Sequence, residues 1–127
     1  MRRADQRRAA VVALYQHEVT SRSTEEVMPD DASSFTRELV DGVLQHQGQL
    51  DALIERYAQG WTLDRIAPLE RSILRTALYE MLHRMDVPDE VAIDEAVEAA
   101  KELCAAEAPK FVNGILGAVK RTEVTRQ

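Results

Sequence analysis

The stretch Pro68–Arg84, PLERSILRTALYEMLHR, carries apolar residues around most of a helical circumference. Two neighbouring rows of i, i+4 steps run along it: Leu69, Ile73 and Ala77, then Leu74, Leu78 and Leu82. A helix with so wide an apolar surface must pack against other helices on several sides. Pro68 suits its first position, where a missing N–H costs nothing. The pattern therefore predicts a central helix.

Polar residues interrupt this apolar surface, and we expect them at seams between helices or on an outer face: Glu70, Arg71, Arg75, Tyr79 and Glu80. An exposed polar group on an otherwise buried helix is a candidate contact for a partner protein.

Helical periodicity continues on both sides of the central stretch. We expect helices over 3–20, 35–44, 50–57 and 93–104, and a last helix from Pro109; residues 20–34 predict a surface loop. Trp61, in a short helical turn before Pro68, is expected in the core. Gly114 inside the last helix suggests a close approach of two helices. Strand alternation is absent from the sequence, so the fold is expected to be all-α with about six or seven helices.

The bulk composition bounds the function. At 127 residues the chain predicts one domain with a real core, and its single cysteine, Cys104, fits a reducing cytoplasm. No run of residues reaches the length of a membrane span.

The charge is unevenly spread. The net charge is −6, but residues 1–8 and residues 110–127 each carry four basic residues and one acidic residue, a net +3 at each end. An acidic body with two basic ends suggests a basic patch if the ends meet, and two solvated termini if they do not.

Two features suit contacts with RNA. Arg3 and Arg7 are i, i+4 neighbours on the first helix, a spacing that lets two guanidinium groups follow successive phosphates. Phe111 beside Lys110 either extends the apolar stripe of the last helix or offers an aromatic face to a base.

Catalytic and metal-binding motifs are absent from the sequence. His17, His46 and His83 stand in separate segments, and no His or Cys lies three or four residues from another. There is no glycine-rich phosphate loop and no nucleophile elbow. We therefore expect no enzyme activity, no metal and no cofactor.

Five sequence blocks resemble the bacterial transcription antitermination family NusB: ALY at 13–15, FTRELVDGV at 35–43, ERSILRTALYEM at 70–81, DVPDEVAIDEAVEAAK at 86–101 and KFVNGIL at 110–116. They follow the family's order over nearly the whole chain. Gln6 and Arg8 depart from the family's pattern in the first helix.

The resemblance implies two small packed helical bundles, here divided as 1–60 and 61–127. It also implies a cytoplasmic adaptor that binds the boxA element of ribosomal RNA transcripts together with NusE, a small-subunit ribosomal protein, within the RNA polymerase antitermination complex.

The residues implied to face single-stranded RNA are Arg3, Arg7, Glu107 and Phe111, with Arg2, Arg8, Tyr15 and Lys110 beside them. Whether Arg2 and Arg8 touch RNA or are only solvated stays open. Glu70 matches a position where the family touches NusE, and Arg75 and Tyr79 on the same helix join it as candidates.

Two rival functions remain. One is a helical DNA-binding transcription regulator. The other is the RNA-binding module of a larger ribosomal RNA methyltransferase, for which we expect no room after KFVNGIL. The free state, monomer or homodimer, is left open.

Overall fold

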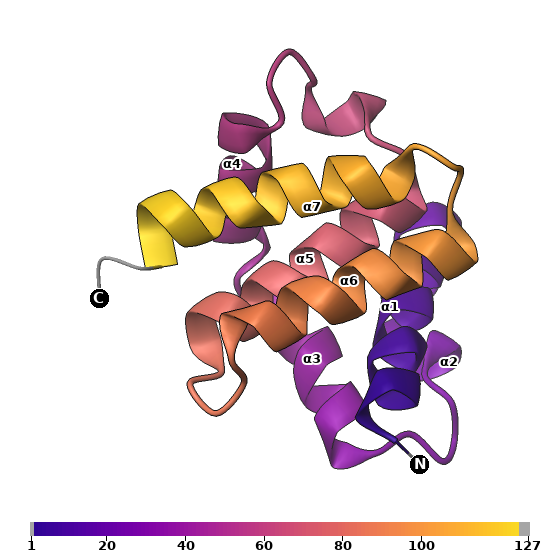
Figure 1. Ribbon diagram of the computed structural model, residues 1–127. Helices are drawn as coiled ribbons and strands as arrows, with labels where there is room; N and C mark the ends of the chain where they lie inside the picture. The colour runs from indigo at the N-terminus through magenta and orange to yellow at the C-terminus, as the bar shows by residue number, and fades with distance from the viewer. Residues whose placement is uncertain (1, 125–127) are drawn as a thin grey trace.

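The computed structural model describes residues 2–124 of the chain, all of whose regular structure is helical (Figure 1). The helices are α1 (Arg3–Thr20), α2 (Thr24–Val27), α3 (Ser34–Gln45), α4 (Gln47–Tyr57), α5 (Pro68–His83), α6 (Asp89–Leu103) and α7 (Ala108–Val119), with a 3-10 turn η1 (Leu63–Arg65) and a π-helical end η2 (Lys120–Val124). The predicted all-α class is confirmed.

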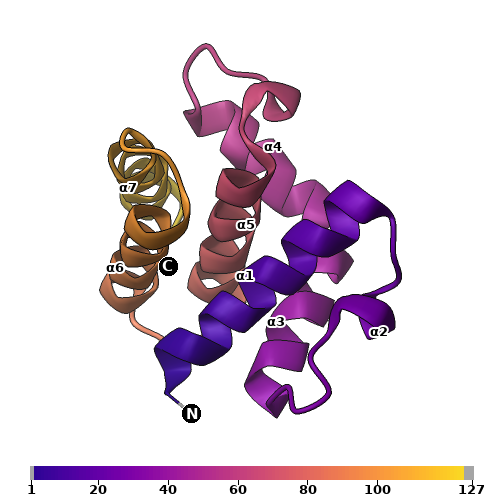
Figure 2. The same cartoon turned by 90° about the vertical axis from the view of Figure 1, so that its right-hand side faces the viewer.

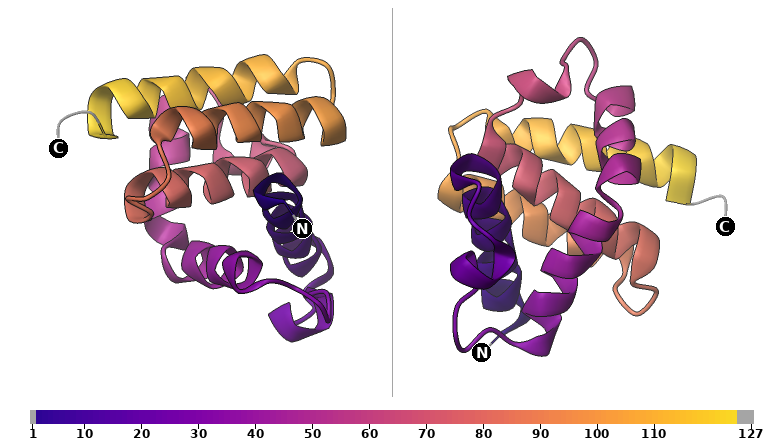
Figure 3. Two further views of the ribbon diagram at one scale, coloured as in Figure 1. Left: turned by 60° about the horizontal axis from the view of Figure 1, so that its bottom comes forward. Right: turned by 180° about the vertical axis from the view of Figure 1, so that it is seen from behind.

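Helix α5 is the centre of the molecule, as its sequence predicts. It packs against α1, α3, α4, α6 and α7. Figure 2 shows α6 and α7 on one side of α5 and α1 and α3 on the other, and both views of Figure 3 agree. Every residue from Ser72 to Met81 is buried. Because apolar side chains cover almost the whole circumference, only burial on all sides removes them from water.

Polar side chains within this buried stretch all have partners inside the protein. The Ser72 hydroxyl donates to the carbonyl of Val11 at 2.6 Å, and the Thr76 hydroxyl donates to the carbonyl of Ser72 at 2.8 Å. In the described residues no buried side-chain nitrogen or oxygen lacks a hydrogen-bond partner. The core is therefore apolar, and the polar groups buried between its helices are hydrogen-bonded, as buried polar groups generally are.

A short helix interrupts the segment predicted as a loop. The Ser23 hydroxyl accepts from the Glu26 N–H, and the Glu26 carboxylate accepts from the Ser23 N–H, which is a capping box. One turn is too short for apolar periodicity, so the prediction missed α2 although its cap is visible in the sequence.

The close approach of two helices occurs at Gly42 and not at Gly114. A Cβ on Gly42 of α3 would lie 2.2 Å from Cζ of Tyr79 on α5, whereas one on Gly114 would meet no atom within 4 Å. Gly42 thus lets α3 lie against the tyrosine ring. The prediction for Gly114 was wrong, because a glycine in a helix does not show which face it occupies.

The two basic ends do not form one patch in the described part of the chain. Figures 1 and 3 show α1 beginning far from the end of η2. Lys120 reaches Glu90 at the start of α6 at 2.5 Å.

The division of the fold at residue 60 stays a prediction. None of the described helices has both the length and the apolar character needed to cross a membrane.

Candidate nucleic-acid and partner interface

The arginines at and just before the start of α1 have different surroundings. Arg2 is exposed and lies 3.7 Å from Asp5. Arg3 is also exposed, and its guanidinium carbon stands 3.9 Å from the centroid of the Phe35 ring. A guanidinium over an aromatic face keeps its N–H groups directed outward at the ring's edge. Arg3 is therefore a cation that the fold holds at the surface.

Arg7 is buried, which corrects its predicted role. Its side chain is 10 % exposed, and its Nε and Nη2 donate to Glu80 of α5 at 3.0 and 2.9 Å. A buried guanidinium that donates through two of its three nitrogens to a buried carboxylate has little left for phosphate. The prediction that Arg3 and Arg7 act as a phosphate-binding pair therefore fails for Arg7.

Arg8 and Tyr15 lie on other parts of α1. Arg8 donates from Nε to Glu102 of α6 at 3.1 Å and lies 3.8 Å from Glu95. Tyr15 is half-buried. The carboxylates of Glu95 and Glu102 on α6 are thus partly neutralised by Arg8.

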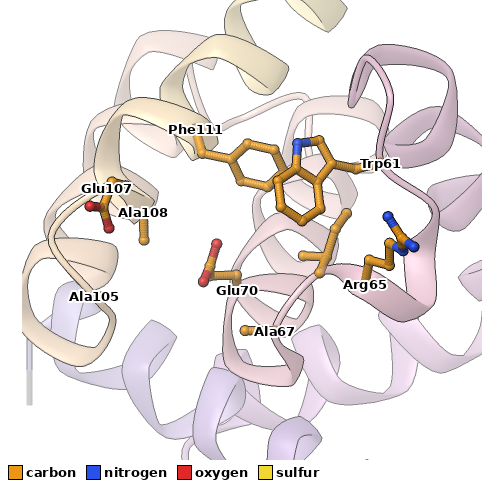
Figure 4. Close-up of a pocket in the computed structure, with 9 residues that line it drawn as sticks. Trp61, Arg65, Ala67, Glu70, Ala105, Glu107, Ala108 and Phe111 are labelled. Carbon is orange, nitrogen blue, oxygen red and sulfur yellow. The ribbon is translucent and has the colours of Figure 1, made fainter.

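An aromatic pair stands where α7 begins. Phe111 of α7 and Trp61, in the segment between α4 and η1, lie with ring centroids 6.1 Å apart in an edge-to-face arrangement. Figure 4 shows both rings at the rim of a cavity. This cavity, of about 270 Å³, is also lined by Arg65, Glu70 and Glu107.

Trp61 is the residue that sequence reasoning misplaced. It is 50 % exposed, although it was expected in the core. A signal was present, because Trp61 follows Gly60, which has φ +82°, in a connection between two helices and outside either helical stripe. Residues in such a connection have no helical face to bury.

Two carboxylates make this cavity acidic. Burial raises the pKa of Glu70 above its usual value, and the nearby charge of Glu107 raises it further. Burial, assisted by Glu70, raises the pKa of the Cys104 thiol to about 11. In Figure 4 the Glu70 carboxylate points into the cavity beneath the two rings. It is placed to meet a cationic or hydrogen-bond-donating partner group.

Arg75 and Tyr79 do not share this exposed position. Arg75 is 6 % exposed and donates to Asp51 at 2.7 Å and Glu18 at 2.8 Å. Tyr79 is 8 % exposed, and its hydroxyl donates to Glu38 at 3.2 Å. Both side chains connect α5 to its neighbours, so the expectation that they contact a partner protein loses its structural basis.

The residues expected to face RNA lie near different ends of α5. Arg7 meets Glu80, whereas Phe111 shares a cavity with Glu70. These two glutamates are separated by roughly 15 Å along the helix axis at 1.5 Å per residue. The fold therefore does not bring Arg3, Arg7 and Phe111 into one cluster.

Between residues 2 and 124, no three His, Cys, Asp or Glu side chains are grouped to hold a metal ion.

Comparison with known families decides the relationship. The sequence model of the NusB family matches residues 4–121. The chain belongs to the NusB family. The transcription antitermination protein NusB of Symbiobacterium thermophilum is 41 % identical over 138 aligned positions, which cover 95 % of this chain and 90 % of the relative. NusB of Frankia casuarinae is 54 % identical over 68 % of this chain and 64 % of its own length, slightly less than two thirds of that relative.

Solved NusB structures share the fold. NusB of T. maritima is 34 % identical with a TM-score of 0.88, covering 98 % of this chain and 94 % of that one. A crystal structure of antitermination factors NusB and NusE in complex with double-stranded RNA contains a chain 25 % identical to this one, with a TM-score of 0.81 and coverage of 95 % and 98 %. Family membership leaves the helical DNA-binding regulator without support.

Proposed function

We propose that this protein is a non-catalytic RNA-binding adaptor for transcription antitermination. It binds boxA of ribosomal RNA transcripts together with NusE and supports processive transcription by RNA polymerase in the cytoplasm. Membership of the NusB family supports the role, and a similar fold solved with NusE and RNA supports the partners. The observation that carries the proposal is the aromatic pair at the head of α7, in which Trp61 is exposed and Phe111 is half-buried.

Bases unstacked from a single strand can stack on aromatic side chains, and each stack contributes roughly 1–3 kcal/mol. Phe111 has the exposed Lys110 beside it to meet the backbone. Arg2, Arg3, Arg8 and Tyr15 on α1 form the second part of the proposed surface, with Arg7 acting inside the protein instead.

Glu70 is the proposed contact for NusE. It stands at the head of α5, half-buried, with a carboxylate whose pKa is raised by burial and by Glu107. A ribosomal protein offers many basic groups, and a partly desolvated carboxylate pairs strongly with one of them. Glu107, which lines the same cavity, stays a proposed RNA-facing residue.

The test is binding of labelled boxA RNA in the presence of NusE. Phe111→Leu keeps an apolar side chain but removes the π-face, so affinity should fall by roughly 1–3 kcal/mol while the melting temperature stays near the wild-type value. Arg3→Ala should lower the salt slope by about 0.7. Arg22→Ala, in the connection after α1, is the control.

Glu70→Lys should weaken NusE binding and leave the helical circular-dichroism spectrum unchanged. If the wild-type protein binds neither boxA RNA nor NusE, the proposed function is wrong. Unchanged affinity in Phe111→Leu would return this ring to a purely structural role.

A further inference from the structure

A second groove lies on the other side of the aromatic pair. Its walls are the end of α4 and the outer face of α7 with η2, and it encloses about 360 Å³. The residues that matter for its chemistry are Arg56, Tyr57, Trp61, Lys110, Phe111, Gly114 and Arg121. Trp61 and Phe111 line both this groove and the acidic cavity, so the two rings separate the two hollows.

The two hollows carry opposite charge. Glu70 and Glu107 line the first together with Arg65, whereas Arg56, Lys110 and Arg121 line the second. Among the described residues, Glu123 brings a carboxylate to the second groove, 3.4 Å from Arg56. The Tyr57 hydroxyl donates to that same carboxylate at 2.6 Å and holds it against α4. The groove remains net positive, and the side chain of Arg56 is 67 % exposed.

One residue that lines this groove, Gly114, has no side chain to fill it. A Cβ on Gly114 of α7 would meet no atom within 4 Å, and the residue is exposed. Glycine inside a helix costs about 1 kcal/mol relative to alanine. No neighbouring helix requires its small size, and its place on the groove leaves the space above it open.

We propose that this groove, formed by Arg56, Lys110, Gly114 and Arg121 beside Trp61, binds a single-stranded nucleotide next to the one that stacks on Phe111. The inference rests on the proposed RNA-binding function and extends its RNA path from the head of α7 along that helix. Cations beside an exposed aromatic ring in a groove are the combination that binds single strands, since phosphates meet the charges and a base meets the ring. The carboxylates of the acidic cavity would repel phosphates, so the RNA backbone follows the basic groove.

The experiment compares two exposed helical glycines, of which only Gly114 lines the groove. Gly114→Glu places a carboxylate and its side chain in the groove, while Gly48→Glu makes the same charge change in α4, where an added Cβ also meets no atom within 4 Å. Binding of labelled single-stranded boxA RNA is measured by fluorescence anisotropy, and stability by thermal melting. We expect Gly114→Glu to weaken RNA binding at least tenfold with the melting temperature retained, and Gly48→Glu to bind as the wild type does.

A second variant keeps the test decisive if Gly114→Glu folds poorly. Arg56→Gln should lower the salt slope of RNA binding by about 0.7. Wild-type affinity and slope in the folded groove variants, or an equal loss in both glutamate variants, would overturn the groove site while leaving the proposed function intact. Lost NusE binding with RNA binding retained would show a protein surface and also overturn it. Failure of the wild type to bind RNA would instead remove the proposed function itself.

Discussion

Arg7 of α1 and Glu80 of α5 form a buried two-pronged ion pair between residues 73 apart in the sequence. Their side chains are 10 % and 1 % exposed. The desolvation of two such charges offsets most of their attraction, so the pair adds little net stability. Removal of one partner, however, leaves an isolated buried charge. The pair therefore makes the packing of α1 on α5 specific.

Arg7→Ala should accordingly lower the free energy of unfolding by about 3–5 kcal/mol. Replacing both residues, Arg7→Met with Glu80→Leu, should restore most of that loss, because no charge is left buried. Urea denaturation measures both effects, and Arg2→Ala in an exposed pair is the control, with an expected change of about 0.5 kcal/mol or less. A single-variant loss no larger than that control would contradict the buried-pair interpretation.

Gly42→Ala should destabilise the protein by about 1–3 kcal/mol, because its Cβ would overlap the Tyr79 ring and force α3 away from α5. Gly114→Ala, where the added Cβ meets no neighbour, should instead stabilise α7 by about 0.5–1 kcal/mol. Thermal melting of the two variants compares them directly. A neutral or stabilising effect of Gly42→Ala would show that the packing of α3 on α5 does not depend on Gly42.

The acid sensitivity of the protein should depend partly on Glu18. Burial raises the pKa of this carboxyl, but hydrogen bonds from Arg75 and Arg71 outweigh burial and lower the pKa below its ordinary value of 4.5. A carboxylate with a lowered folded-state pKa stabilises the fold above its unfolded pKa and loses that effect as the pH falls through the folded value.

Glu18→Gln should therefore destabilise the protein at pH 7 and progressively less as the pH falls below about 4.5. Urea midpoints of both proteins over this range measure the difference, and Glu25→Gln on the exposed α2 serves as the control. A difference between Glu18→Gln and wild type that is independent of pH would exclude a role for the ionised carboxylate.

Sequence patterns predicted the helices well because helix formation is local. The two apolar rows of residues 68–84 are visible in the sequence, and both require neighbours around α5. The aromatic ring at Phe111 was singled out beside Lys110 in the last helix, and the carboxylate at Glu70 was singled out as a polar residue of the central helix and through the resemblance to the NusB family. Side chains whose surroundings come from distant segments were less predictable. Arg7 looked like a surface cation because Glu80 is brought to it only by folding.

By itself, the amino-acid sequence determined the all-helical class, the central position of residues 68–84 and the likeness to the NusB family. Periodicity and motif order contain that information within short windows of the chain. The tertiary structure alone decided that Arg7 lies inside, that Trp61 lies outside against Phe111, and that the ring pair divides an acidic cavity from a basic groove. Burial and electrostatic environment depend on the residues that other helices bring near, and such contacts between distant segments have no local sequence signature.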